Sequence, residues 1–176
     1  MANFLKKNWI WIALVAALVA GNVWFVTQGR RDTGLSERVP NFALRTFDGG
    51  AIYMEELRGR PVLLYFWAAW CIFCDKEMPM LERFTKEFPE LVVIGVHRSE
   101  TESREVAVKY AEERGITYPL VADPNDNIFN YFVGGSNIVP LSVLIDREGF
   151  VVDRIVGPRY EDQFRALIEG LLKKKD

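Results

Sequence analysis

The chain has 176 residues, of which 49% are hydrophobic and 13% aromatic, and its formal net charge is -2. This composition excludes an intrinsically disordered chain, and the charge argues against a nucleic-acid binder, since neutralising phosphates requires clustered Lys and Arg. Two cysteines are too few for a framework of disulfides, so the fold must depend on a hydrophobic core, for which the length suffices.

The first predicted element is an apolar run over residues 9–26, preceded by two lysines. As a helix it would be roughly 27 Å long at 1.5 Å per residue, close to the bilayer's hydrocarbon core of about 30 Å. Tryptophans at both ends match an aromatic belt. We expect residues 1–8 to be a cytoplasmic N-terminus and residues 9–26 a transmembrane anchor. A cleaved signal peptide and a buried soluble helix are the alternatives.

Residues 27–38 are polar and charged without periodicity, which is typical of a short tether. The folded domain then covers residues 39–176. It opens with partial alternation over residues 42–47, an Asp-Gly-Gly turn and a returning strand at residues 51–53, which together predict a β-hairpin.

An apolar strand over residues 62–67 leads to the two cysteines, Cys71 and Cys74, and a helical pattern follows them. A run that is nearly all apolar indicates a central strand buried on both faces. In the first turn of a helix, unsatisfied N–H groups and the positive end of the macrodipole favour a thiolate, so such cysteines commonly have a lowered pKa. The second cysteine is close enough in sequence to close a reversible disulfide.

Two other interpretations of this cysteine pair are weaker. A zinc site needs about four N or S ligands, whereas the chain has two cysteines and one histidine, His97. A purely structural disulfide would close so short a loop that it would remove little chain entropy. We therefore interpret the pair as a redox-active dithiol, with no metal and no cofactor.

The segment Phe66-Trp67-Ala68-Ala69-Trp70-Cys71-Ile72-Phe73-Cys74 resembles the active site of the thioredoxin superfamily. Its continuation through Glu77 and Pro79 is similar to the C-x-x-C-x-x-E-x-P motif of membrane-anchored, extracytoplasmic thiol–disulfide oxidoreductases of the TlpA/ResA type. The resemblance covers about residues 39–172. The two residues between the cysteines are not the Gly-Pro of thioredoxin itself, and Tyr65 stands where thioredoxin has a buried aspartate.

The rest of the domain alternates helices with strands. We expect helices over residues 71–88, 105–114, 127–132 and 160–172, and strands over residues 91–96, 118–121, 141–145 and 150–155. Pro79 should kink the first of these helices. Together with the resemblance, this order predicts an α/β, thioredoxin-like fold with a mixed central sheet, helices on both faces and an N-terminal hairpin extension, preceded by one transmembrane helix.

The resemblance implies a substrate-binding surface around the cysteines. Relatives carry a cis proline at the position of Pro140, so we expect a cis bond there, against the alternative of a trans proline at a strand edge. Val139 would then offer its N–H and C=O groups to an extended peptide. Trp70, Ile72 and Phe73 complete the expected substrate-binding residues.

Glu77 lies one helical turn after Cys74 and should project near the thiols. The motif match favours a functional carboxylate over an ordinary solvated glutamate. Shielded by the sheet, it would have a raised pKa and could carry a proton to or from Cys74. We expect Trp67 to pack in the core and His97 to be a hydrogen-bonded structural residue.

In the expected mechanism Cys71 is the nucleophile that attacks a disulfide of a partner protein, and Cys74 resolves the mixed disulfide. The resemblance implies a reductase that is re-reduced by an integral membrane thiol donor and acts on extracytoplasmic protein clients, such as apocytochrome c. Three alternatives stay open: a disulfide-forming oxidant, a thiol peroxidase, and a non-catalytic chaperone or assembly factor.

Basic residues flank both ends of the predicted anchor, so charge does not set its orientation. A dithiol that acts on the disulfides of other proteins suits an oxidising compartment. We therefore expect a single-pass protein of the cytoplasmic (inner) membrane whose catalytic domain faces the periplasmic or extracytoplasmic side.

Overall fold

The apolar run before the cysteines forms β3 (Val62–Trp67), an inner strand of a seven-stranded sheet. The computed structural model describes residues 37–133 and 137–173. β3 pairs in parallel with β4 (Val92–Arg98) and antiparallel with β6 (Leu141–Ile145), and all six of its residues are buried. A strand that is covered on both faces has to be apolar almost throughout, which explains the pattern in the sequence.

Four further strands extend the sheet to the order β2-β1-β5-β4-β3-β6-β7. They are β1 (Ala43–Thr46), β2 (Ala51–Tyr53), β5 (Leu120–Asp123) and β7 (Val151–Val156). β5 is parallel to β4, whereas the β1–β2 hairpin and β7 are antiparallel to their neighbours. The carboxyl ends of β3, β4 and β5 therefore share one edge of the sheet, and the loop that carries the cysteines begins there.

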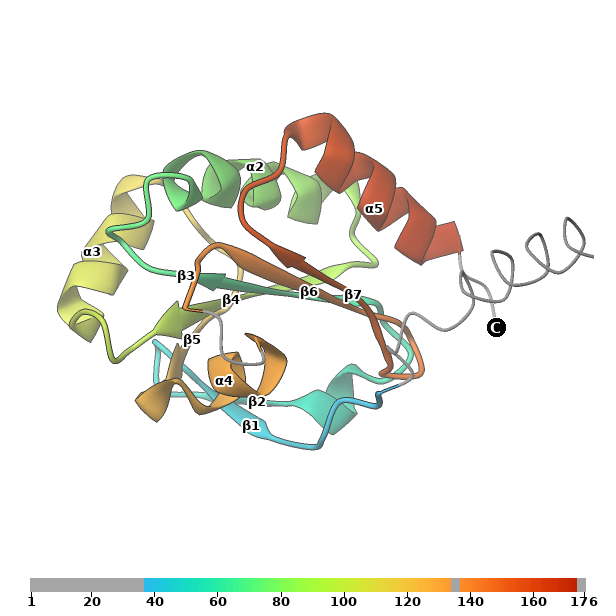
Figure 1. The fold of residues 1–176 in the computed structure, drawn as a ribbon, viewed down its shortest axis with the longest axis horizontal. Helices are drawn as coiled ribbons and strands as arrows, with labels where there is room; N and C mark the ends of the chain where they lie inside the picture. The colour runs from blue at the N-terminus through green and yellow to red at the C-terminus, as the bar shows by residue number, and fades with distance from the viewer. Residues whose placement is uncertain (1–36, 134–136, 174–176) are drawn as a thin grey trace, which may run out of the picture. The chain divides into compact units, whose positions relative to one another are not determined.

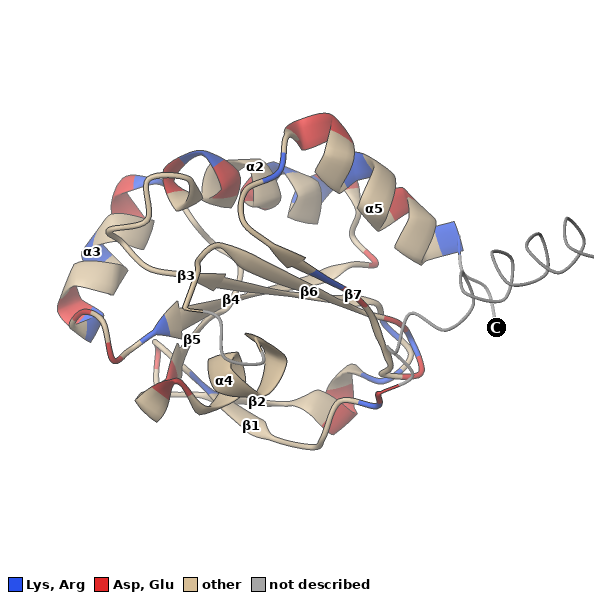
Figure 2. Cartoon of the chain, viewed as in Figure 1, with Lys and Arg blue, Asp and Glu red and all other residues tan. Residues whose placement is uncertain are grey.

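Helices cover both faces of this sheet, as predicted. They are α2 (Cys74–Glu87), α3 (Arg104–Glu113), α4 (Asn127–Val133) and α5 (Glu161–Lys173), with short 3-10 helices η1 (Met54–Leu57) and η2 (Pro124–Asp126). In Figure 1, α2 and α5 lie on one side of the sheet and α4 lies on the other. Acidic and basic residues are interspersed on α2, α3 and α5 (Figure 2), so these helices present no surface of a single charge.

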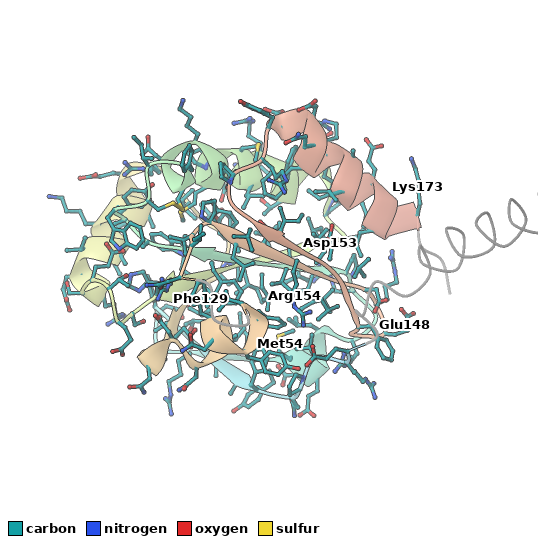
Figure 3. The ribbon with its side chains drawn as sticks, viewed as in Figure 1. Met54, Phe129, Glu148, Asp153, Arg154 and Lys173 are labelled. Carbon is teal, nitrogen blue, oxygen red and sulfur yellow. A yellow bond between two sulfur atoms is a disulfide. The ribbon has the colours of Figure 1, made fainter. Side chains whose placement is uncertain are left out.

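Because successive side chains of a strand point to opposite faces, β3 contacts helices on both sides of the sheet. Tyr65 and Trp67 point to one face, where Trp67 stacks on Tyr110 of α3 with 5.5 Å between ring centroids. Phe66 points to the other face and contacts Phe129 of α4, with 5.6 Å between the centroids. Phe129 can be followed between α4 and the sheet in Figure 3. The predicted burial of Trp67 in the core is confirmed.

Most predicted elements lie within one or two residues of the observed ones, and two boundaries differ for identifiable reasons. β5 begins at Leu120 instead of residue 118, since Pro119 has no N–H to donate to a ladder. α2 begins at Cys74, so Cys71 lies in the turn that precedes the helix. Pro79 lies inside α2, which runs on to Glu87; the kink there stays a prediction.

The predicted anchor at residues 9–26 lies outside the described residues. Within the described part, no helix is both long enough and apolar enough to span a membrane. Two residues at the end of the expected tether contact the domain: Arg38 forms a β-bridge with Phe150, and the side chain of Glu37 pairs with Arg154 at 2.6 Å.

Candidate active site

Cys71 and Cys74 form a disulfide at the start of α2, with an S–S distance of 2.17 Å and a Cα–Cα distance of 5.3 Å. Cys71 is 4% exposed and Cys74 is fully buried. The backbone N–H of Cys74 donates to the carbonyl of Cys71 at 3.0 Å and also approaches its Sγ at 3.2 Å. The sulfur of Cys71 thus lies against an N–H group at the positive end of the helix, where a thiolate is favoured.

The loop between β3 and Cys71 is held by a histidine–glutamate pair. His97 lies beside Trp67 in the parallel register of β4 and β3. Its Nε2 is 2.9 Å from Glu102 Oε1, and the same oxygen accepts the N–H of Ala69 at 2.5 Å. Burial lowers the pKa of His97, and the bond to Glu102 opposes this effect. His97 is therefore a hydrogen-bonded structural residue, as predicted.

Glu77 is buried against the sheet, and each of its carboxylate oxygens accepts one hydrogen bond. The Tyr65 hydroxyl donates to Oε2 at 2.7 Å, and the backbone N–H of Arg159 donates to Oε1 at 2.5 Å. Burial raises the pKa of Glu77, while these two bonds oppose the shift without cancelling it. The predicted shielding and raised pKa are confirmed; the catalytic role of Glu77 is taken up below as a proposal.

The Val139–Pro140 peptide bond is cis, as the resemblance implied. Both residues are buried, whereas the preceding Ile138 is 54% exposed. The carbonyl of Pro140 accepts the N–H of Gly157 from the loop after β7. Among the described residues, the N–H and C=O of Val139 have no hydrogen-bond partner.

A buried ion pair supports the segment that leads to Val139. Arg98, the last residue of β4, pairs with Asp126 and lies over the ring of Phe129, 4.0 Å from its centroid. It also donates to Asn137 Oδ1 at 2.6 Å. This support is not predicted from the sequence; the one signal for it is the polar pair His97-Arg98, which ends an otherwise apolar strand.

Exposed apolar side chains surround the buried disulfide. Trp70, Ile72 and Phe73 are 55%, 77% and 51% exposed, respectively, so all three predicted contacts are open to a partner. A groove of about 520 Å³ begins at Phe73 and reaches Glu77; it is also lined by Lys76, Met80, Arg83, Pro158, Arg159, Tyr160 and Glu161. The part of the groove after β7 was missed, because its residues lie more than eighty positions from the cysteines in sequence.

Within the described residues, no group of three or more His, Cys, Asp and Glu side chains could hold a metal ion.

The position of the disulfide defines the class of protein. It lies between the central strand and the helix that follows, and the cis Val139–Pro140 bond directly precedes β6, which pairs with β3 in a mixed α/β sheet. This is the arrangement of a thioredoxin-like protein. The chain belongs to the AhpC/TSA family, whose model matches residues 35–154.

Two relatives extend this comparison over most of the chain. "Thiol-disulfide oxidoreductase ResA" of Bacillus thuringiensis is 31% identical over 97% of this chain and 98% of its own length. "Thioredoxin-like protein YneN" of Bacillus subtilis is 31% identical over 86% of this chain and 91% of its own.

Solved structures agree with the observed fold. A thiol:disulfide interchange protein of the thioredoxin family from Chlorobium tepidum has a TM-score of 0.70 at 27% identity, covering 78% of this chain and 97% of that chain. DsbF of Mycobacterium tuberculosis, solved in mixed oxidised and reduced forms, has a TM-score of 0.68 at 26% identity, covering 76% of this chain and 98% of that chain.

Proposed function

We propose that this protein is a protein-disulfide oxidoreductase that reduces disulfides of extracytoplasmic proteins through Cys71 and Cys74. The observation that carries the proposal is the N–H of Cys74 directed at the sulfur of Cys71 at the start of α2. A group that approaches a sulfur in the disulfide would also stabilise it as a thiolate after reduction. Relatives named as thiol–disulfide oxidoreductases support the same activity.

The reaction needs only the two sulfurs and a disulfide in the client protein. The Cys71 thiolate attacks one client sulfur; a bond forms between the two, the client S–S bond breaks, and the other client sulfur leaves as a thiolate. Cys74 then loses its proton and attacks the sulfur of Cys71, which releases the second client thiolate. The client gains two electrons, and the protein is left with the Cys71–Cys74 disulfide.

Two sets of residues would assist this exchange. Glu77, buried on the same helix as Cys74, would accept the proton that Cys74 loses. Trp70, Ile72 and Phe73 would contact apolar residues of the client, while the N–H and C=O groups of Val139, next to Pro140, would pair with its extended backbone. The exposure of the three apolar side chains supports the first role, and the lack of a hydrogen-bond partner for the Val139 backbone within the described part of the chain supports the second.

The location and the electron donor are proposals of the same kind. Residues 1–8 would lie in the cytoplasm, 9–26 would anchor the chain in the inner membrane, 27–38 would be the tether, and 39–176 the extracytoplasmic domain. An integral membrane thiol donor would re-reduce the protein, and apocytochrome c is a candidate client. The alignment with ResA over 97% of the chain supports a shared organisation.

The direct test of the proposed function is capture of the mixed disulfide. The Cys74→Ser variant lacks the resolving thiol, so it should accumulate covalent adducts with client proteins that are released by a reductant. The Cys71→Ser variant is the matched control and should form none. Adducts with Cys71→Ser alone would reverse the two roles. Adducts with neither variant, together with full activity of the double Cys→Ser variant in cells, would favour a non-catalytic assembly factor.

The proposed location has its own test. In intact spheroplasts, an added protease should digest the domain if it lies outside the cytoplasmic membrane. Protection of the domain, with digestion only after the membrane is broken, would place the domain in the cytoplasm and contradict the proposal.

A further inference from the structure

Tyr65 lies in the middle of β3 and is fully buried, yet its hydroxyl meets a carboxylate instead of an apolar neighbour. We propose that Tyr65 is a positioning residue, whose hydroxyl fixes the carboxylate of Glu77 on the helical turn that carries Cys74 and keeps it ready to accept a proton. The inference rests on the proposed function, because it concerns the proton that Cys74 loses during exchange.

The geometry leaves the Glu77 carboxylate little freedom. Its two oxygens are held by donors from two different parts of the fold, the Tyr65 hydroxyl on β3 and the Arg159 N–H before α5, at 2.7 and 2.5 Å. Both donors favour the ionised carboxyl group, whereas burial favours the neutral one. Tyr65 therefore counteracts the burial that raises the pKa of Glu77.

Tyr65 also keeps its own proton. Burial, together with the charge of Glu77, raises the pKa of Tyr65 well above its ordinary value, so the hydroxyl stays a donor across the working range. The hydroxyl has no other hydrogen-bond partner among the described residues. Replacing Tyr65 with Phe would thus remove one donor from Glu77 while keeping the ring that fills the core.

Other titratable groups around this pair lie on three helices and in two loops. They are Tyr110 on α3, Tyr118 before β5, Lys76 and Arg83 on α2, Arg159 in the loop before α5, and Glu161 on α5. Of these, Arg159 contacts Glu77, and its charge adds to the effect of its N–H group. Substituting Tyr65 leaves all of these groups in place, which makes the substitution a specific probe.

The step affected is the second half of the exchange. Cys74 attacks the sulfur of Cys71, the bond between Cys71 and the client sulfur breaks, and the client leaves as a thiolate. The proton of Cys74 passes to the Glu77 carboxylate. Tyr65 neither gains nor loses a proton; it donates to the carboxylate before the transfer and determines how readily the transfer occurs.

The test uses the purified full chain with three substitutions: Tyr65→Phe, Glu77→Gln and, as the matched control, Tyr118→Phe. Tyr118 is also a buried core tyrosine, and its hydroxyl has no hydrogen-bond partner among the described residues. Two quantities are measured against pH: the carboxyl ¹³C chemical shift of Glu77, and, after reaction of the reduced protein with oxidised glutathione, the rate at which Cys74 resolves the mixed disulfide between Cys71 and glutathione.

In Tyr65→Phe, Glu77 should titrate at a higher pH than in the wild type. Below the wild-type midpoint the exchange rate should fall about ten-fold, as expected for losing one charge-assisted hydrogen bond, and it should recover at alkaline pH. Tyr118→Phe should leave both curves unchanged. A merely structural role of Tyr65 would lower the rate at every pH without moving the midpoint, and would overturn the inference.

The remaining outcomes separate the inference from the proposed function. If Glu77 titrates as in the wild type in Tyr65→Phe, the inference fails while the dithiol function stands. If the titration moves but the exchange profile is identical in the wild type, Tyr65→Phe and Glu77→Gln, Glu77 takes no part in exchange and the inference is again overturned. If the wild type itself does not react with the disulfide, the proposed function fails.

Discussion

Glu77 is the residue at which burial and hydrogen bonding act most clearly against each other. Its carboxylate has lost most of its contact with water, which penalises the charged form, while two donors compensate in part. An apolar residue here would avoid this penalty but would leave both donors without an acceptor. A buried titratable group on the helix of the thiol pair is consistent with the proposed role of its proton.

This balance predicts how stability depends on pH. Because the folded-state pKa of Glu77 is raised, its favourable contribution is complete below the unfolded-state pKa and is lost as the pH rises through the folded-state pKa. Glu77→Gln cannot ionise, and its amide can still pair with Tyr65 and Arg159. The variant should therefore gain stability relative to the wild type as the pH rises, by about 1.4 kcal/mol for each unit by which the two pKa values differ.

Denaturant unfolding of both proteins over a range of pH measures this difference. The control is Glu87→Gln, because Glu87 is an exposed residue of the same helix whose carboxylate pairs with Arg165. If the free energies of unfolding of Glu77→Gln and the wild type differed by the same amount at every pH, ionisation of Glu77 would not destabilise the folded protein, and this account would be contradicted.

At the scale of elements, α2 is attached to the rest of the domain by a second buried glutamate. The Glu82 carboxylate accepts hydrogen bonds from two residues just before β5. The N–H and the hydroxyl of Thr117 donate at 2.8 and 2.7 Å, and the N–H of Tyr118 donates at 3.4 Å. Thr117 and Tyr118 precede Pro119 and lie outside the strand pairing of β5, so their donors bond Glu82 and not a neighbouring strand. Glu82 thus joins the helix of the active site to the loop that enters the parallel part of the sheet.

Removing Glu82 should therefore cost more than removing an exposed charge of the same helix. Glu82→Ala leaves up to three donors without their acceptor and should lower the free energy of unfolding by about 2–4 kcal/mol. Arg83→Ala, which breaks an exposed pair with Glu161, should lower it by less than about 1 kcal/mol. Equal losses in the two variants, measured by denaturant unfolding, would contradict this account of α2.

The elements could be predicted from the sequence where a local pattern determines them. The apolar run of β3, the helical stripe of Met78, Leu81 and Phe84, and the cysteine motif all lie within short windows. The partners of the site residues could not be predicted in this way. Glu77 bonds Tyr65 and Arg159, which are 12 and 82 positions away in the chain, and no periodicity links positions so far apart.

At the scale of the whole molecule, the same limit applies to the order of the strands. The N-terminal hairpin was predicted from its turn, but its attachment to β5, at the far side of the parallel strands, depends on pairing between Arg45 and Ala122 that no local signal reveals. The cis bond before Pro140 came from the resemblance and not from the residues themselves. The resemblance to a known family thus predicted the cis bond, which the spacing of residues in the sequence does not indicate.

The seven-stranded sheet and its two helical layers, and not the disulfide, should hold the domain together. The bridge closes a loop of only four residues, so the chain-entropy model gives it about 2 kcal/mol at most. Reduction of the wild type, or the double Cys→Ser substitution, should lower the free energy of unfolding by no more than this amount. Loss of cooperative unfolding on reduction would show instead that the bridge is a structural support.

The central claim is that the sulfur of residue 71 is ionised by the N–H groups at the start of α2. The most direct measurement is the alkylation rate of each cysteine in the reduced full chain as a function of pH, read by mass spectrometry. Cys71 should titrate well below the pKa of about 8.5 of a free cysteine, and Cys74 should react much more slowly. A Cys71 that titrates at or above the value of free cysteine would contradict the account.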